Sequence, residues 1–104
     1  MATSPTQLTL KNLRERGYMS EVVEHWNSFA RIRQDLFGII DVIGVGNGET
    51  IAVQSTSYTN TSARQKKMMD SIALPELRDA NWKIEIHGWH KVKNRWKVRI
   101  IDLS

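Results

Sequence analysis

The chain contains no cysteine and no long apolar run, and each absence excludes a class of protein. Without cysteine, neither a disulfide framework nor a thiolate metal site can form, which is compatible with a reducing cytosol. No apolar run approaches the ~20 residues that a transmembrane helix needs. The N-terminal stretch lacks a basic segment followed by an apolar one, so we expect no signal peptide. These features predict a cytoplasmic protein without a membrane partner.

The length of 104 residues bounds the organisation of the protein. We expect one domain over residues 1–104, with a single modest core and no second independent site. Hydrophobic residues make up 40% of the chain and charged residues 25%, which is ordinary for a globular protein. A folded domain is therefore expected.

The middle of the chain predicts a β-hairpin. Asn47-Gly48 separates two apolar runs, and both residue types tolerate the positive φ of a tight turn. A two-residue loop pairs Gly46 with Glu49, and the same register places Asp41 opposite Gln54. Residues 39 and 56 would then also pair. Because opposed residues share one face of a hairpin, the acid and the amide should meet.

Asp41 is the residue that a purely structural role explains least. Residues 39–45 are otherwise apolar on both faces, which predicts a central strand covered by helices on both sides. A carboxylate in such surroundings carries a desolvation cost and needs a partner. A hard divalent cation held by oxygen ligands is one such partner. Asp41 and the amide oxygen of Gln54 are therefore candidate metal ligands.

Coarse periodicity predicts the order helix, three strands, helix, two strands. The first helix is expected over residues 6–16 and the first strand over residues 18–26. A polar loop at 27–34 would lead to hairpin strands at 39–45 and 50–57. A second helix over 62–74 would end at Pro75, followed by a turn or helical piece over 76–81. Two strands, 82–90 and 95–103, would flank a turn at Lys93-Asn94.

Basic residues outnumber acidic ones by four, and the isoelectric point is near 9.7, which favours polyanionic partners. A solvated surface would explain any single basic cluster. Three clusters around a candidate metal site instead favour nucleic acid, with the first two as the predicted contacts. They are Arg31 with Arg33; Arg64 with Lys66 and Lys67; and Lys83, Lys91, Lys93, Arg95, Lys97 and Arg99.

The pattern of Asp41, a hairpin and Gln54-Ser55-Thr56 resembles the core motif of the PD-(D/E)XK nuclease superfamily. It is most similar to the small Holliday-junction-resolvase-like members and their phage-encoded relatives. In that motif one strand carries an Asp and the next carries Glu-x-Lys or Gln-x-Lys. Together these residues hold a metal. The resemblance covers residues 5–75. It implies a restriction-endonuclease-like α/β fold of order α-β-β-β-α-β-β, with a central mixed sheet flanked by helices.

The resemblance also implies a function. The protein would be an endonuclease that hydrolyses phosphodiester bonds in DNA, including branched DNA, with Mg²⁺ or Mn²⁺ as cofactor. Asp41 would hold the metal with the amide oxygen of Gln54 and a backbone carbonyl near Ser55. Junction resolvases make two cuts, which implies a homodimer. The phage-encoded relatives imply a phage protein that acts in the host cytoplasm.

Three positions depart from the motif. Gln54 stands where Glu is usual, Thr56 stands where Lys is usual, and neither residue of 6–7 supplies the acid that the first helix often carries. In some relatives the lysine lies on the following helix, so Lys67 or Lys66 would replace it, although a solvated basic face explains both equally. The alternative is a catalytically inactive nuclease fold that binds DNA or a partner protein. A structural protein with an incidental basic surface is a third reading.

Two further carboxylates are candidates for the same site. Glu24 lies on the predicted first strand, beside the hairpin, where it would either join the metal or form an ordinary salt bridge. Asp35 precedes Asp41 by six residues and would point into the same cleft, pair with Arg33, or cap the turn. The full candidate catalytic set is therefore Glu24, Asp35, Asp41, Gln54, Thr56 and Lys67.

Overall fold

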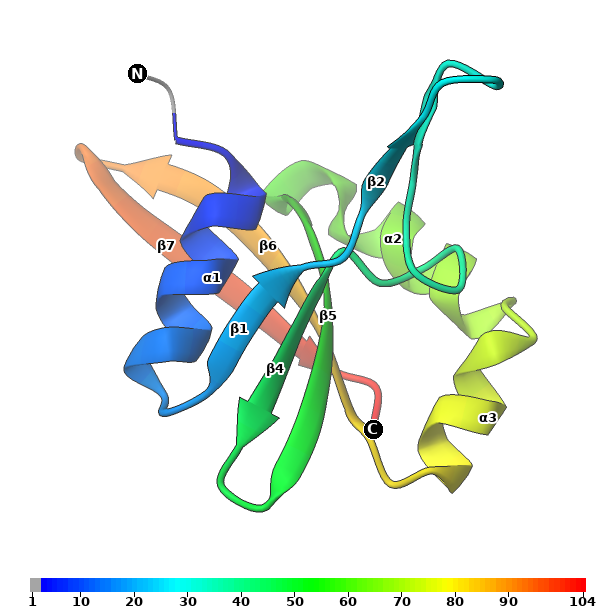
Figure 1. Ribbon diagram of the computed structural model, residues 1–104. Coiled ribbons are helices and arrows are strands. Elements are labelled where there is room, and N and C mark those ends of the chain that lie inside the picture. Colours follow the sequence, from blue (N-terminus) through cyan, green and yellow to red (C-terminus); the bar gives the residue numbers. More distant parts are fainter. Residues whose placement is uncertain (1–2) are drawn as a thin grey trace.

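The chain folds around a twisted sheet that carries helices on both sides (Figure 1), in a computed structural model that describes residues 3–104. Within these residues the helices are α1 (Pro5–Glu15), the 3-10 helix η1 (Tyr58–Asn60), α2 (Thr61–Met69) and α3 (Ala73–Asp79). The strands are β1 (Met19–Val22), β2 (His25–Asn27), β3 (Ile32–Gln34), β4 (Val42–Gly46), β5 (Glu49–Ser57), β6 (Lys83–Val92) and β7 (Arg95–Asp102).

The main sheet has five strands in the order β1-β4-β5-β6-β7. Strands β5 and β6 are parallel, and every other neighbouring pair is antiparallel. The crossover between the parallel strands contains α2 and α3. The predicted α/β class with a central mixed sheet is confirmed, because a parallel pair needs such a helical crossover while the hairpins give antiparallel pairs.

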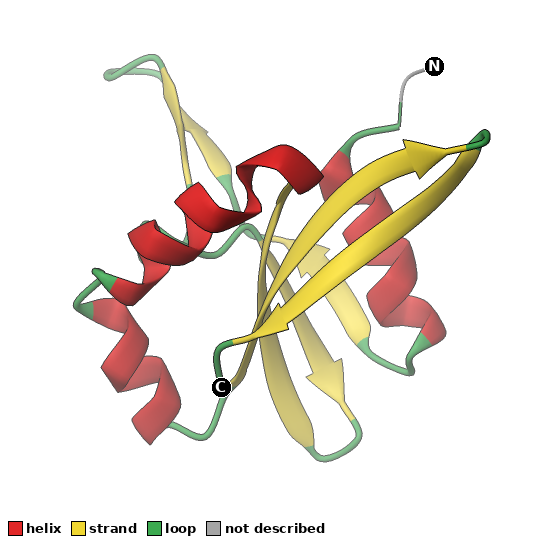
Figure 2. Cartoon of the chain, turned by 180° about the vertical axis from the view of Figure 1, so that it is seen from behind, coloured by secondary structure: helices red, strands yellow, loops and turns green. Residues whose placement is uncertain are grey.

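Two apolar clusters hold the layers together, one on each face of the sheet. Figure 2 shows α1 on one side and α2 with α3 on the other. The α1 cluster comprises Leu10, Leu13, Tyr18, Val42, Ile51 and Val53. The cluster under α2 and α3 comprises Ile39, Ile40, Ala52, Met68, Leu74, Leu77, Ile84, Ile86 and Leu103.

The strand buried on both faces is β5 and not β4, which corrects the prediction for residues 39–45. Residues 51–56 of β5 are all buried, whereas Val45 of β4 is exposed and Ile43 is half-buried. Strand β5 is the third of five strands, so helices cover both of its faces.

The predicted hairpin is confirmed in its turn and register. Asn47 and Gly48 both have positive φ, at 55° and 75°, and Gly46 pairs with Glu49. Regular pairing stops at Val42 and Val53, so Asp41 lies immediately before β4 instead of within it. The expected pairing of residues 39 and 56 is wrong, because residues 36–40 form a separate bridged turn.

Residues 18–34 also differ from the prediction. Strand β1 ends at Val22, and the expected loop over residues 27–34 instead contains the second half of a small hairpin, β2–β3. Asn27 closes this hairpin, because its side-chain oxygen accepts hydrogen bonds from the backbone N–H groups of Phe29 (3.0 Å) and Ala30 (3.1 Å). Such Asn-centred turns compete well with an open loop.

The predicted second helix is divided in two. Helix α2 ends at Met69, and α3 begins at Ala73. The backbone N–H of Ala73 donates a hydrogen bond to the hydroxyl oxygen of Ser71 at 3.1 Å. Pro75 does not end a helix but lies in the first turn of α3, where its missing N–H leaves no bond unmade. None of the helices in residues 3–104 has both the length and the apolar character needed to cross a membrane.

Candidate metal centre

A cleft of about 810 Å³ opens where β5 ends and the crossover to α2 begins. In open sheets with parallel strands, ligands bind at the carboxyl ends of the strands beside such a crossover. The start of α1, the base of the β2–β3 hairpin, the end of β5 and helix α2 all contribute to its wall. The lining residues are Pro5, Thr6, Glu24, His25, Arg33, Gln34, Asp35, Gly38, Asp41, Gln54, Ser55, Thr56, Ser57, Arg64 and Lys67.

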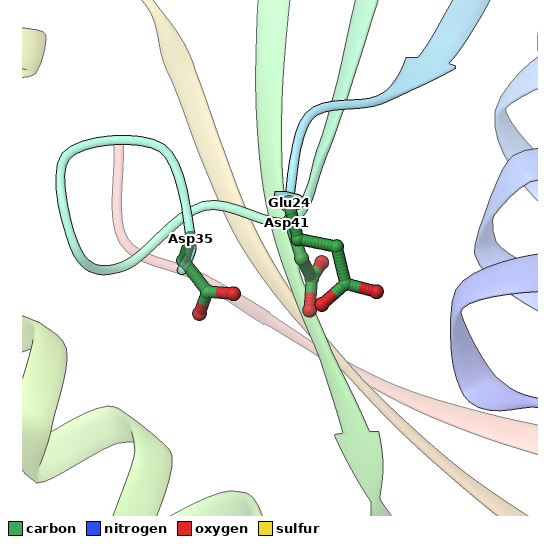
Figure 3. Close-up of side chains that lie close together, drawn as sticks. All are labelled: Glu24, Asp35 and Asp41. Atoms are coloured by element: carbon green, nitrogen blue, oxygen red, sulfur yellow. The ribbon is translucent and has the colours of Figure 1, made fainter. Parts of the chain in front are cut away.

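Three carboxylates converge in this cleft. Glu24, Asp35 and Asp41 each offer an oxygen within 4.8 Å of the others. They come from three segments: the link between β1 and β2, the residue that follows β3, and the residue that precedes β4 (Figure 3). The structure therefore brings together the three acids that the sequence singled out. Oxygen donors in this arrangement suit a hard divalent cation.

Asp41 is the buried member of the cluster, with 4% of its surface exposed. Backbone bonds on both sides hold its position, because its N–H donates to the carbonyl of Val53 (3.1 Å) and its own carbonyl accepts from Val23 (2.9 Å). Its side-chain oxygens accept from the backbone N–H of Ser55 at 3.0 and 3.1 Å and from Nε2 of Gln54 at 2.9 Å. The predicted meeting of Asp41 and Gln54 is thus confirmed.

The carboxyl of Asp41 has a pKa of about 7, well above its ordinary value. Burial is the main cause, and the negative charges of Asp35 and Glu24 raise the pKa further. The hydrogen bonds from Ser55 and Gln54 act in the opposite direction and are too weak to offset burial. Near neutral pH this group therefore favours a bound proton or a cation.

Gln54 supplies a second sign that a cation fits here. Its side chain is buried, and its amide oxygen Oε1 has no hydrogen-bond partner among residues 3–104. A half-turn of the amide exchanges its oxygen and nitrogen and places Oε1 against Asp41. Two acceptors are compatible there only if a proton or a cation lies between them. The donor set of three carboxylates and one amide oxygen fits Mg²⁺ or Mn²⁺.

Glu24 also has the salt bridge that was its alternative explanation. Its carboxylate lies 3.6 Å from Nη1 of Arg33, across the base of the β2–β3 hairpin. The guanidinium is largely exposed, so this pair adds little stability. Arg33 therefore balances part of the negative charge of the cluster, and Glu24 remains free to turn an oxygen to the metal position.

The predicted cations divide between the cleft and the outer surface. Arg33, Arg64 and Lys67 line the cleft, whereas Lys66 bonds to Asp70 at 3.0 Å one turn along α2. Lys66 is therefore the weaker of the two candidates to replace the motif lysine. Arg31 lies on the turn of the β2–β3 hairpin and is not among the residues that line the cleft.

A buried polar network behind the cleft was missed from the sequence. The hydroxyl of Ser55 donates to Oγ1 of Thr9 on α1 (2.7 Å), and Nε1 of Trp89 donates to the same oxygen (3.0 Å). Both acceptor positions of Thr9 are then filled, so its own proton is directed at Nδ1 of His87, 3.2 Å away. Strand β5, whose Ser55 also donates to Asp41, is therefore hydrogen-bonded to helix α1.

The network ends in an ion pair. Nε2 of His87 lies 2.9 Å from Glu85, which accepts a bidentate bond from Arg16 at 2.9 and 3.1 Å. Burial alone would raise the pKa of Glu85, but the bonds from His87 and Arg16 outweigh it and lower the pKa to about 2. The alternation of Glu85, His87 and Trp89 on one strand face was the available sequence signal.

No family model matches this chain, and no curated protein or solved structure does so either. The resemblance to PD-(D/E)XK nucleases therefore stays a prediction from the motif. What the site can do has to follow from its own geometry and charge. That geometry is an acid cluster with an unpaired amide oxygen, set in a cleft with arginine and lysine side chains in its wall.

Proposed function

We propose that the protein is a metal-dependent endonuclease that hydrolyses phosphodiester bonds in DNA. The observation that carries this proposal is the convergence of Glu24, Asp35 and Asp41 around one position, with the buried Asp41 at a pKa of about 7. Three carboxylates repel one another and would also repel a phosphate. A divalent cation removes both repulsions, because it neutralises the acids and attracts the phosphate.

The residues of the cleft would have distinct roles in binding the metal. Asp41, Glu24, Asp35 and the amide oxygen of Gln54 would hold Mg²⁺ or Mn²⁺. When bound, such an ion lowers the pKa of a coordinated water and stabilises charge on a phosphoryl oxygen. The backbone N–H of Ser55 keeps the Asp41 carboxylate in one orientation, with both of its oxygens in contact.

The cations of the cleft have a separate role. Arg64 and Lys67 line the cleft from helix α2, and Arg33 lines it from the small hairpin, where it contacts Glu24. They would hold phosphates beside the metal, so that affinity falls steeply with salt. Lys67 takes the place of the motif lysine, since position 56 carries a threonine. It would stabilise the charge that develops on the phosphate.

The decisive experiment compares Asp41→Asn with the wild type. Labelled four-way junction, flap and linear duplex DNA are incubated with Mg²⁺, Mn²⁺ or EDTA. We expect cleavage that requires the metal and is lost in the variant. Asp79→Asn is the matched control, since Asp79 is exposed at the end of α3. Cleavage that persists in Asp41→Asn would place the chemistry elsewhere.

The metal comparison is itself informative. One ligand is a neutral amide in place of a carboxylate, which weakens a site for Mg²⁺ more than for Mn²⁺, because Mn²⁺ binds more strongly in the ordinary series of affinities. We therefore expect faster cleavage in Mn²⁺. Equal or faster cleavage in Mg²⁺ over a full titration would contradict this ligand set.

The second candidate is a binding module with the same cleft and no chemistry. The observation that favours it is Thr56, which lines the cleft at the motif position for lysine. In that case no substrate is cut in any metal, and DNA binding survives both EDTA and Asp41→Asn. A homodimer belongs to the endonuclease proposal, since a four-way junction is resolved by two cuts. Sedimentation of the free and DNA-bound protein tests it.

A further inference from the structure

The β2–β3 hairpin stands apart from the rest of the fold. It pairs with no strand of the main sheet and extends away from it, as both Figure 1 and Figure 2 show. Its large apolar side chains face solvent: Phe29 is 100% exposed, Trp26 59% and Ile32 50%. Trp26 and Ile32 lie on opposite faces of the hairpin and Phe29 lies at its tip, so apolar surface is exposed on all sides of a projecting element, where a partner can bind it.

The tip of this hairpin has a defined conformation. The backbone N–H groups of Phe29 and Ala30 both donate to the side chain of Asn27, and Arg31 N–H donates to the carbonyl of Asn27 at 2.7 Å. Arg31 adopts φ of 55°, which completes the turn. The aromatic ring of Phe29 is therefore presented from a constrained turn.

The base of the hairpin is part of the metal cleft. Glu24 and His25 enter it on one side, and Arg33, Gln34 and Asp35 leave it on the other, and all five line the cleft. Phe29 is four residues along the chain from Arg33. Glu24 is five residues from Phe29, so at a strand rise of about 3.3 Å per residue the tip lies at most about 16 Å beyond this metal ligand.

The charge of the hairpin identifies the partner class. Residues 25–34 contain two arginines and no acid. Trp26 is paired with Arg33 across the hairpin, and exposed aromatic rings beside arginines are the combination that binds unpaired bases, since each base stacks on a ring while the cations contact the backbone. A second copy of this chain is disfavoured at the same surface, because its own basic hairpin would repel it.

We propose that the β2–β3 hairpin is a base-stacking arm, which makes the preferred substrate DNA with unpaired bases close to the cleaved bond. Phe29 at the tip and Trp26 on β2 stack on bases, and Arg31 holds the adjoining phosphate. At ~3.4 Å per nucleotide, the arm reaches bases up to about five nucleotides from the metal. In a straight duplex these bases are stacked on their neighbours and are out of reach. This inference rests on the proposed nuclease function.

The test measures binding without cleavage. Fluorescence anisotropy in EDTA gives the affinity for a 20-nucleotide single strand, a fully paired duplex and a forked duplex with two unpaired arms. We expect Phe29→Ala to weaken binding to the single strand and the fork about tenfold, the range typical for loss of one stacked base. Duplex binding should change less than twofold. Ile72→Ala is the control, because Ile72 is 93% exposed in the link between α2 and α3 and is not among the residues that line the cleft.

Two conservative variants separate stacking from simple apolar contact. Phe29→Tyr keeps a flat ring and should retain wild-type affinity, whereas Phe29→Leu keeps an apolar side chain without the ring and should behave as Phe29→Ala. An equal loss for the fork and the duplex would overturn the proposal. So would unchanged affinity in Phe29→Ala, or a dimer in sedimentation that becomes a monomer in that variant.

The same variants distinguish the two proposals. If junctions and forks are cleaved normally by Phe29→Ala, with unchanged affinity, the arm is refuted and the nuclease stands. If no DNA is cleaved in any metal but Phe29→Ala loses affinity for unpaired bases alone, the nuclease proposal is refuted. The hairpin then binds unpaired bases as part of a binding module. Melting temperatures of the Phe29 variants should match the wild type, because the Phe29 side chain is fully exposed.

Discussion

Replacement of Asp41 by Asn should stabilise the metal-free protein above neutral pH. The pKa of Asp41 rises from an ordinary 3.8 to about 7 on folding, mainly through burial. A raised pKa means that the native state binds the proton more tightly than the unfolded state does. The stability contributed by this proton is fully present below about pH 4 and is lost as the pH rises to about 7.

The size of the effect follows from the shift. About three pKa units at ~1.4 kcal/mol each give a loss of about 4 kcal/mol between pH 4 and pH 8. Asn carries no charge and escapes this loss. Its oxygen can accept from the N–H of Ser55, and its NH₂ can donate to Oε1 of Gln54 after a half-turn of the Gln54 amide. Asp41→Asn should therefore be about 2–4 kcal/mol more stable than wild type at pH 8, and about equal at pH 4.

Urea unfolding in EDTA at both pH values measures the difference directly. With a slope of about 2 kcal/mol/M, the midpoint of the variant at pH 8 should lie about 1–2 M higher. Mn²⁺ should raise the midpoint of the wild type at pH 8 and leave that of the variant unchanged, since a ligand of the folded state stabilises it. Asp79→Asn, at an exposed position, should differ by less than about 0.5 kcal/mol at either pH.

The reasoning fails if Asp41→Asn is less stable than wild type at pH 8, or if the difference does not depend on pH. The first result would mean that the bonds to Ser55 and Gln54 outweigh the burial of the charge. The second would mean that Asp41 does not titrate between pH 4 and pH 8. Either result would remove the physical reason for a cation at this position.

Two further substitutions test the packing around the site. Glu85 has a pKa of about 2 instead of 4.5, because the hydrogen bonds from His87 and Arg16 outweigh the effect of burial. The stability that the ionised Glu85 contributes is therefore present above pH 4.5 and is lost as the pH falls to 2. Glu85→Gln should cost about 3 kcal/mol at pH 7 and flatten the acid limb of the unfolding curve, and an unchanged acid limb would refute the assignment. Gly88→Ala should destabilise by about 1–3 kcal/mol, because its methyl carbon would lie 2.3 Å from Oγ1 of Thr61. Thr61→Ala in the same chain should recover part of that loss in thermal unfolding, and simple additivity would contradict the clash.

Much of the candidate site follows from local sequence. Asn47-Gly48 sets the hairpin register because its two residues accept positive φ, and that register alone brings Asp41 to Gln54. Apolar periodicity also predicts a first helix, the central hairpin and two last strands, but it assigned the strand buried on both faces to residues 39–45, and the structure has it at residues 51–56. Asn27, whose side chain closes the turn of the β2–β3 hairpin, was the local signal from which that hairpin could be predicted. The polar composition of residues 27–34 predicted a loop instead.

Other features were decided only by tertiary structure. Glu24 and Asp35 reach Asp41 because the β2–β3 hairpin folds the chain back on itself, which no periodicity reports. Thr9 and His87 are 78 residues apart and meet only when α1 packs on the sheet. Turn residues restrict their own backbone angles, so the sequence alone determines a hairpin register. Contacts between distant segments depend instead on how whole elements pack, and packing is a property of the assembled fold.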